Sequence, residues 1–187
     1  ENRKQALGER RVGLGVMGLH DLLIYCETVY GSDEGNQLVN QIFEVIATTA
    51  YRTSIELAKE KGSFPFLDKD KFIQSNFIQK HVKKYNEWNE IIEGIKKYGI
   101  RNAKLISIAP TGTLSLTFGN NCSSGIEPIF SLSYDRKVKM GGQREDDIQI
   151  VPMKDYAYGL WEETKNGNIV NKDIFITAME MSVDDHL

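Results

Sequence analysis

The residues with the clearest potential for chemistry lie at 110–115 and read Pro-Thr-Gly-Thr-Leu-Ser. They follow a short apolar run at 104–109, which is typical of a buried strand and which ends at Pro110. Gly112 permits a tight turn or a close approach of the backbone to a ligand. If a helix begins near Thr113, its first N–H groups are unpaired, and with the neighbouring hydroxyls they form a site suited to phosphate. An ordinary strand, turn and hydroxyl cap would contain the same residues, so both interpretations stay open at this point.

A second candidate is the glycine pattern at 13–18, Gly-Leu-Gly-Val-Met-Gly, which matches the G-x-G-x-x-G fingerprint of dinucleotide-binding proteins. Asp33 follows about 20 residues later, where the fingerprint places the acid that binds the ribose. The fingerprint also needs an apolar strand before it, whereas residues 8–11 read Gly-Glu-Arg-Arg. Its acid must end a second strand, but residues 19–30 indicate only a helix. We therefore favour close helix packing by these glycines, with a nicotinamide or flavin site as the alternative.

The two cysteines, Cys26 and Cys122, do not form a disulfide framework. The helix expected at 19–30 has one apolar face, made by Leu19, Leu22, Leu23 and Cys26. We therefore predict that the Cys26 thiol is an inert part of the core. No group of His, Cys or Asp residues has the spacing of metal ligands, so we predict no metal site.

Length and composition indicate one globular domain over residues 1–187. Hydrophobic residues make up 41% of the chain and charged residues 26%, which excludes a disordered protein. The net charge of −3 gives no general attraction to nucleic acid, so any phosphate binding must be local. No apolar run approaches the roughly 18 residues of a membrane span, and we expect no signal peptide. With so few cysteines, we predict a reducing, cytoplasmic location.

The two ends of the sequence predict a piece of a longer chain. The first residue is Glu1 rather than Met, and it opens a polar stretch that runs to Arg11. Near the other end, Ser182 followed by Asp185 is typical of a helix start. A helix that stops after one turn is not stable by itself.

The elements that must position these residues alternate between helices and short strands. We predict helices at 19–30, 33–61, 70–84, 87–98 and 155–164, and strands at 104–109, 129–138 and 148–151. The segment 139–147 is a charged loop around Gly141 and Gly142, and 173–181 fits either a strand or a helix. This alternation predicts an α/β fold with mostly parallel strands. The apolar face of the helix at 87–98 consists of Trp88, Ile91, Ile92, Ile95 and Tyr98.

Three motifs, in one order, carry a resemblance to a known family. They are Arg-Val-Gly-Leu-Gly-Val-Met-Gly-Leu at 11–19, Ala-Pro-Thr-Gly-Thr-Leu-Ser at 109–115, and Ser-Ser-Gly-Ile-Glu-Pro-Ile-Phe at 123–130 with Tyr134 and Arg136 beyond it. In this order the sequence resembles the large catalytic chain of ribonucleotide reductases over nearly its whole length, most of all the adenosylcobalamin-dependent class. The resemblance implies a ten-stranded α/β barrel of two parallel halves, of which this chain would form most of the second half.

The resemblance also implies a role for the loop at 110–115. In the family, the matching loop receives the phosphates of the nucleotide substrate, a ribonucleoside diphosphate. Its contacts carry over to the backbone N–H groups and hydroxyls of Thr111, Gly112, Thr113, Leu114 and Ser115. Pro110 and Glu127 are expected to support this site, and Glu127 would either brace the loop or touch the substrate. His20 stands where the family usually has a small residue, so we expect a surface or packing variant and not a ligand.

The chemistry of the family begins with a cysteine thiyl radical that takes the 3′-hydrogen of the ribose. The radical cysteine sits in an Asn-x-Cys-x-Glu segment that precedes the phosphate loop. Asn120 and Cys122 match the first half of that segment, but Ser124 stands where the glutamate belongs, and the match follows the loop. We therefore predict that Cys122 is a structural thiol. With no catalytic residue and no terminal pair of redox cysteines, this chain alone is predicted to be inactive.

For the full enzyme, the resemblance implies adenosylcobalamin as the radical source, although no residue here evidently binds it. The implied partners are the ribonucleoside diphosphate, the remainder of its own chain and a second copy in a homodimer. One alternative is the class in which a separate metal-containing subunit supplies the radical, because its catalytic chain shares the fold. The other alternative is a non-catalytic nucleotide-binding or structural domain.

Overall fold

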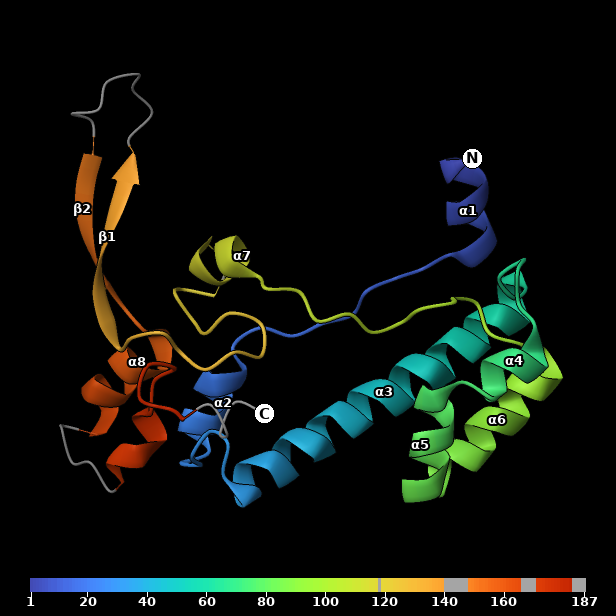
Figure 1. The fold of residues 1–187 in the computed structure, drawn as a ribbon, viewed down its shortest axis with the longest axis horizontal. Coiled ribbons are helices and arrows are strands. Elements are labelled where there is room, and N and C mark those ends of the chain that lie inside the picture. The colour runs from blue at the N-terminus through green and yellow to red at the C-terminus, as the bar shows by residue number, and fades with distance from the viewer. Residues whose placement is uncertain (118, 140–147, 166–170, 183–187) are drawn as a thin grey trace. The chain divides into compact units, whose positions relative to one another are not determined.

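The computed structural model describes residues 1–117, 119–139, 148–165 and 171–182, which form two compact units (Figure 1). Unit 1 comprises Glu1–Gly15 and Val39–Ile108, and unit 2 comprises Val16–Leu38 and Ala109–Leu187. Helix α3, Asp33–Lys61, begins in unit 2 and ends in unit 1. The predicted loop around Gly141 and Gly142 lies outside the described residues, as does the rest of the helix start predicted at Ser182.

Unit 1 consists of helices around one apolar core. Besides α3, they are α1 (Asn2–Glu9), α4 (Lys69–Ile73), α5 (Asn76–Lys84) and α6 (Glu87–Tyr98). The predicted helices at 33–61 and 87–98 are confirmed, whereas the segment 70–84 forms two helices. The core residues are Ala47, Ile55, Phe64, Ile73, Ile78, Trp88, Ile91, Ile95, Ile100 and Leu105.

Helix α6 shows how the sequence pattern becomes packing. Trp88, Ile91 and Ile95 recur at intervals of three and four residues, so they share one helix face, and all three are fully buried. Tyr98, at the end of the same predicted face, remains 39% exposed. Gly99 follows with φ 77°, a left-handed conformation that favours glycine and ends the helix.

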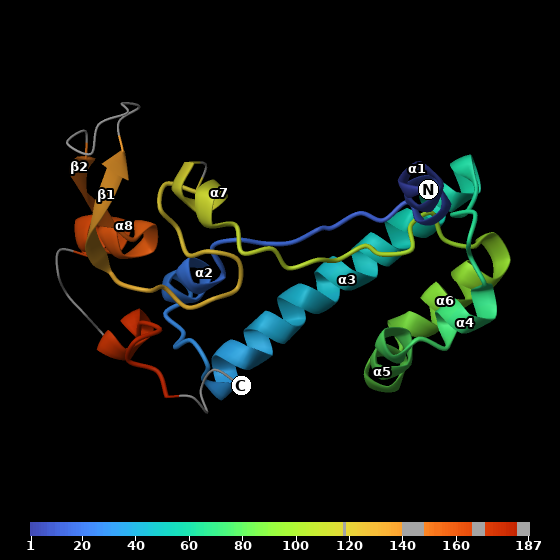
Figure 2. The same cartoon turned by 45° about the horizontal axis from the view of Figure 1, so that its top comes forward.

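Two extended segments of unit 1 pair in parallel (Figure 2). The N–H groups of Val12 and Leu14 donate to the carbonyl oxygens of Lys104 and Leu105 at 3.0 and 2.8 Å, and Ser107 N–H returns a bond to Leu14 at 3.0 Å. The predicted strand at 104–109 is therefore extended, but its predicted burial holds only at its start. Residues 107–110 are exposed in the described structure.

The glycines at 13 and 15 permit this pairing. A Cβ atom at Gly13 would lie 3.0 Å from the Cβ of Ser107, and one at Gly15 would overlap the Ser107 carbonyl oxygen. The segment before them is helix α1 and not an apolar strand, so the dinucleotide fingerprint lacks its first element. The glycines do serve close packing, but between two extended segments and not between helices as predicted.

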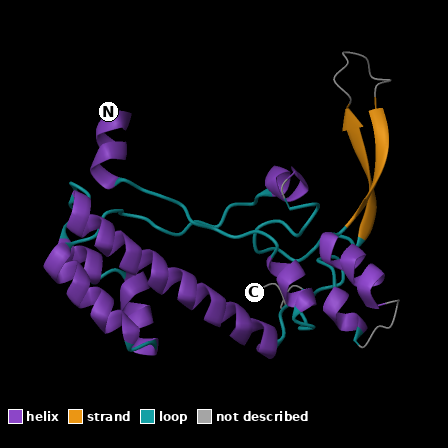
Figure 3. Cartoon of the chain, turned by 180° about the vertical axis from the view of Figure 1, so that it is seen from behind, coloured by secondary structure: helices purple, strands orange, loops and turns teal. Residues whose placement is uncertain are grey.

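Unit 2 combines short helices with one β-hairpin (Figure 3). Its elements are α2 (Leu19–Tyr25), α7 (Gly112–Thr117), β1 (Ser133–Lys139), β2 (Ile148–Lys154), α8 (Tyr156–Lys165) and the 3₁₀ helix η1 (Lys172–Phe175). The strands pair antiparallel, with Ser133 opposite Lys154 and Lys139 opposite Ile148. A core of Ile24, Ile129, Ala157, Trp161, Ile174 and Phe175 joins the helices.

Several sequence-based expectations for unit 2 require correction. The predicted strand at 129–138 begins only at Ser133, and the ambiguous segment 173–181 contains the end of a 3₁₀ helix followed by turns. Helix α2 ends at Tyr25 instead of residue 30, so Cys26 is exposed and is not a core thiol. Over the described ranges the chain is mostly helical, with one antiparallel hairpin and one parallel bridge, so the predicted parallel sheet is not seen there. A parallel sheet needs more strands than this pair, with helices on both faces.

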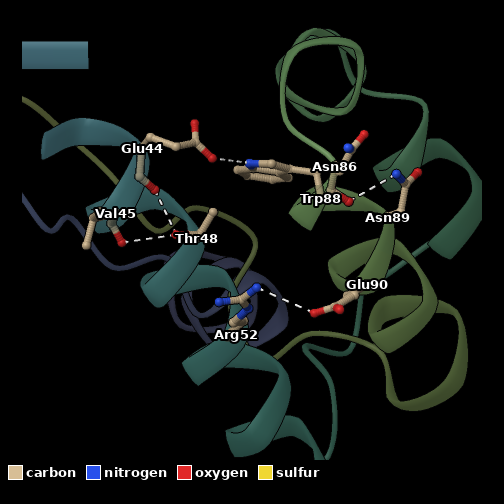
Figure 4. Close-up of polar contacts among 8 residues, drawn as sticks. All are labelled: Glu44, Val45, Thr48, Arg52, Asn86, Trp88, Asn89 and Glu90. Carbon is tan, nitrogen blue, oxygen red and sulfur yellow. Dashed lines mark hydrogen bonds and ion pairs between the residues drawn. The ribbon is translucent and has the colours of Figure 1, made fainter. Parts of the chain in front are cut away.

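One partly buried polar contact joins α3 to α6 (Figure 4). The indole Nε1 of the fully buried Trp88 donates to Glu44 Oε1 at 2.5 Å. Further along α3, Arg52 forms an exposed ion pair with Glu90 at 3.5 Å. A buried donor that loses its acceptor is costly, whereas an exposed ion pair contributes little.

We predict that Glu44→Ala destabilises unit 1 by roughly 1–3 kcal/mol, because it leaves the Trp88 indole N–H buried without an acceptor. Glu44→Gln keeps an acceptor and should recover most of that stability. Trp88 and Trp161 are the two tryptophans of the chain and lie in the separate cores, so 5-fluorotryptophan gives one ¹⁹F resonance for each unit. Denaturant titration of the Trp88 resonance measures the effect. Arg52→Ala is the control on the same helix, and an equal loss there would contradict the assignment.

Candidate functional site

Residues 111–117 turn the chain from an extended segment into helix α7 of unit 2. Thr111 has φ 47°, a left-handed conformation that is rare for a β-branched residue. The Ser115 N–H closes the first helical turn on the Thr111 carbonyl oxygen at 2.8 Å. The N–H groups of Gly112, Thr113 and Leu114 come before that bond and have no acceptor within the described ranges.

The three predicted hydroxyls differ in what they contact. Thr111 Oγ1 accepts a hydrogen bond from Gly125 N–H at 2.7 Å. Ser115 is only 3% exposed; its Oγ donates to the Gly112 carbonyl oxygen at 3.0 Å and lies 3.3 Å from Ser124 Oγ. Thr113 is exposed, and its hydroxyl has no partner in the described part of the chain. Thr111 and Ser115 therefore hold the loop together, while the Thr113 hydroxyl is free to meet a ligand.

The two glycines of this region meet different surroundings. A Cβ atom at Gly112 would meet no atom within 4 Å, so the space around that position is open. At Gly125, where φ is 50°, a Cβ atom would lie 2.8 Å from the Ala109 carbonyl oxygen and 2.8 Å from Glu127 Oε2. Glu127 is exposed, and its Oε2 lies close to the Cα side of Gly125, the residue whose N–H donates to Thr111. This position agrees with a bracing role for Glu127, which stays a prediction, as does the supporting role of the exposed Pro110.

His20 is fully buried and is a packing residue, not a surface variant. Its Nδ1 accepts a hydrogen bond from Ile129 N–H at 2.9 Å, so that nitrogen carries no proton. Burial lowers the pKa of His20 to about 4, and the Ile174 backbone and the Asp21 charge oppose this only in part. The imidazole is therefore neutral at physiological pH.

The sequence pattern did not single out two carboxyl groups that are buried near α2 and α8. Asp21 and Asp155 are each 4% exposed. Asp155 Oδ1 accepts the Tyr158 N–H at 3.1 Å and so caps α8. Burial, together with the charge of Asp21, raises the pKa of Asp155 to about 7. Near neutral pH, Asp155 therefore still holds a proton in much of the folded protein.

The structure agrees with a structural role for Cys122. Its side chain is half-buried, and burial with the charge of Asp21 raises the pKa of its thiol. A raised pKa keeps the thiol protonated and unreactive. Over the ranges that the structure describes, no cluster of His, Cys, Asp and Glu could hold a metal ion. No helix in those ranges is long and apolar enough to cross a membrane.

Comparison with known proteins now identifies the family. The family model described as "Ribonucleotide reductase, barrel domain" matches residues 1–187. A vitamin B12-dependent ribonucleoside-diphosphate reductase of Thermoplasma acidophilum is 33% identical over 191 residues, which cover 95% of this chain and 22% of that protein. The ribonucleoside-diphosphate reductase large chain of Encephalitozoon cuniculi is 33% identical over 206 residues, covering 98% of this chain and 26% of that protein.

A further vitamin B12-dependent ribonucleoside-diphosphate reductase, from Mycobacterium tuberculosis, is 34% identical over 133 residues, which cover 71% of this chain and 16% of that protein. The chain belongs to the ribonucleotide reductase family and matches the barrel domain of its large chain. The predicted family is therefore confirmed. The chain spans about a quarter or less of the length of these relatives.

The raised pKa of Asp155 predicts a pH-dependent stability of unit 2. In the folded state Asp155 binds a proton that the unfolded chain has already lost, so its contribution is fully present below about pH 4 and is lost by about pH 7. The Asp155→Asn variant has an amide at this position, which does not titrate but still offers an oxygen that can accept the N–H at the start of α8. The free energy of unfolding of the variant, minus that of the wild type, should rise by about 1.4 kcal/mol per pH unit across this window and then level off.

The ¹⁹F resonance of Trp161 follows this unfolding, because Trp161 lies in the core of unit 2. Asp135→Asn, at an exposed aspartate of β1, is the matched control for removal of a carboxylate. A difference between Asp155→Asn and wild type that does not change with pH would show that Asp155 is not protonated in the folded state.

Proposed function

We propose that this chain supplies the substrate-phosphate-binding loop of a ribonucleoside-diphosphate reductase, and that residues 110–115 are that loop. The full enzyme would reduce ribonucleoside diphosphates to deoxyribonucleotides by thiyl-radical chemistry in the cytoplasm. The observation that carries the proposal is the unpaired first turn of α7, with three free N–H groups, in a chain that matches the family over residues 1–187. The parallel pairing of the segments around Leu14 and Ile106 supports a place in the second half of the ten-stranded barrel.

The loop offers a diphosphate several hydrogen-bond donors at one place. The N–H groups of Gly112, Thr113 and Leu114 and the hydroxyl of Thr113 have no other partner in the described ranges. A hydrogen bond to a charged group contributes roughly 1.5–3 kcal/mol, so a few such bonds hold an anion even in a protein of net charge −3. Thr111 and Ser115 then act by fixing the loop, since the Thr111 hydroxyl already accepts the Gly125 N–H and the Ser115 hydroxyl already donates to the Gly112 carbonyl oxygen.

The role of this chain in the reaction would be to hold the substrate by its phosphates and so orient the ribose. The radical cysteine, its glutamate and the reducing cysteine pair are expected elsewhere in the whole protein. That protein would also contain the remainder of the chain and would form a homodimer. Cys122 is not assigned the radical role in this proposal, because Ser124 stands where the glutamate of the radical segment belongs and because the match follows the phosphate loop.

Adenosylcobalamin is the cofactor that we propose for the whole enzyme, where it would generate the radical. The support is that vitamin B12-dependent reductases stand among the relatives. We assign no described residue as a cobalamin contact in this proposal. The alternative is the class with a separate metal-containing radical subunit, which the large chains among the relatives favour.

Titration with inorganic phosphate, followed by the amide chemical shifts of the chain, tests the loop. We expect the responding amides to lie at 112–114, with a millimolar dissociation constant that corresponds to about 4 kcal/mol. A ribonucleoside diphosphate should shift the same amides. Responses at 13–18 would instead support the dinucleotide interpretation and overturn the proposal.

Substitutions in the loop give a sharper prediction. Gly112→Val meets open space in the protein, so it should fold normally but place its side chain where phosphate approaches, weakening binding by at least about tenfold. Ser115→Ala removes a hydroxyl that bonds inside the loop and should weaken binding less. Thr117→Val is the control on the same helix and should bind phosphate as the wild type does. Unchanged binding by Gly112→Val would place the anion elsewhere.

A further inference from the structure

The carboxylate of Asp21 joins three elements of unit 2. Asp21 is 4% exposed and lies in the first turn of α2. Its Oδ2 accepts the Ser123 N–H at 2.6 Å, and its Oδ1 accepts the Ala157 N–H at 3.1 Å. One buried side chain therefore ties α2 to the turn at 123–125 and to the first turn of α8.

Hydrogen bonds hold both the side chain and the backbone of Ser123. Its Oγ accepts hydrogen bonds from the N–H groups of His20 and Asp21, at 3.1 and 3.4 Å. Its carbonyl oxygen accepts the Gly18 N–H at 2.8 Å. With the bond from its own N–H to Asp21, the Ser123 backbone has little freedom to move relative to α2.

The next two residues hold the loop that we propose as the phosphate site. Ser124 Oγ lies 3.3 Å from Ser115 Oγ, and Gly125 N–H donates to Thr111 Oγ1 at 2.7 Å. Thr111 has φ 47°, a conformation that a β-branched residue keeps only when its surroundings hold it. The turn at 123–125 thus contacts the loop at both ends of its first helical turn.

We propose that Asp21 is a positioning residue for the loop at 110–115, acting through the turn at 123–125 on Thr111 and Ser115. This inference rests on the proposed function of that loop as the phosphate site. Asp21 does not touch the ligand in this view. It fixes the turn, the turn holds Thr111 in its left-handed conformation, and the loop with its free N–H groups thereby keeps its conformation.

Asp21→Asn tests the proposal while keeping the size of the side chain. The amide replaces one acceptor oxygen with an NH₂ donor, which then opposes the N–H of either Ser123 or Ala157. Phe175→Leu, in the core of unit 2, is the control for a general loss of stability. If Asp21→Asn abolishes the native Trp161 ¹⁹F resonance, Asp21→Ser takes its place, because a hydroxyl still accepts one bond.

Amide hydrogen exchange without ligand gives the first result. We expect Asp21→Asn to speed exchange at Gly125 and Ser115 at least about tenfold more than at Ala178, whose N–H bonds to Ile129 in the same unit. Phe175→Leu should change all three amides alike. Equal acceleration at the three amides in Asp21→Asn would show a general structural role and overturn the proposal.

Phosphate binding gives the second result. Asp21→Asn should weaken binding at 112–114 by about tenfold, and its effect should be smaller in a Thr111→Val background, where the acceptor for Gly125 N–H is already lost and only the contact of Ser124 with Ser115 remains. Additive losses would mean that Asp21 does not act through Thr111. If phosphate fails to shift the loop amides of the wild type, the proposed function falls, while the exchange experiment still decides whether Asp21 positions the loop.

Discussion

The burial of two carboxyl groups without a cationic partner is the constraint on which unit 2 depends. Within the described ranges, Asp21 and Asp155 take part in no ion pair, and their carboxyl groups accept hydrogen bonds from the backbone N–H groups of Ser123, Ala157 and Tyr158. A buried carboxylate is costly unless hydrogen bonds compensate it. The backbone that supplies those bonds must therefore keep its place, and this backbone includes the first turn of α8 and the turn next to the candidate loop. Proton uptake by Asp155 relieves the repulsion between the two carboxyl groups.

The sequence predicts elements that follow a local pattern, but it does not predict the contacts of Asp21, which come from distant parts of the chain. The sequence predicted helices α3 and α6 with the same first and last residues that the structure has. In α6, for example, apolar residues such as Ile91 and Ile95 repeat with the helical period, and Gly99 ends the pattern. Asp21 could not be found in this way, since its partners stand 102 and 136 residues further along the chain. A carboxylate in the first turn of a helix looks like an ordinary exposed residue until the fold brings those partners to it.

The errors have equally local causes. Cys26 fits the apolar face of the helix expected at 19–30, but α2 ends at Tyr25, just before the cysteine, and leaves its thiol exposed. The apolar run at 104–109 is extended as predicted, yet beside its pairing partner around Leu14 only Leu105 of this run is buried, while residues 107–109 are exposed. Ile108 and Leu14 are 42% and 50% exposed, and such apolar surface is typical of a face that meets further chain. The relatives are about four or more times as long as the matched region.

The space around each glycine shows whether the packing of the fold accounts for the absence of a side chain there. Gly15 and Gly125 are needed by the described structure, because a side chain at either position would strike a backbone carbonyl oxygen. Gly112 is different, since a Cβ atom there would meet nothing within 4 Å and its φ lies outside the left-handed range. The described packing therefore gives no reason for glycine at 112, whereas the approach of an anion to the neighbouring free N–H groups does. The open space around Gly112 is therefore consistent with the role that we propose for it in the phosphate loop, whereas the surroundings of Gly15 and Gly125 account for those glycines by packing alone.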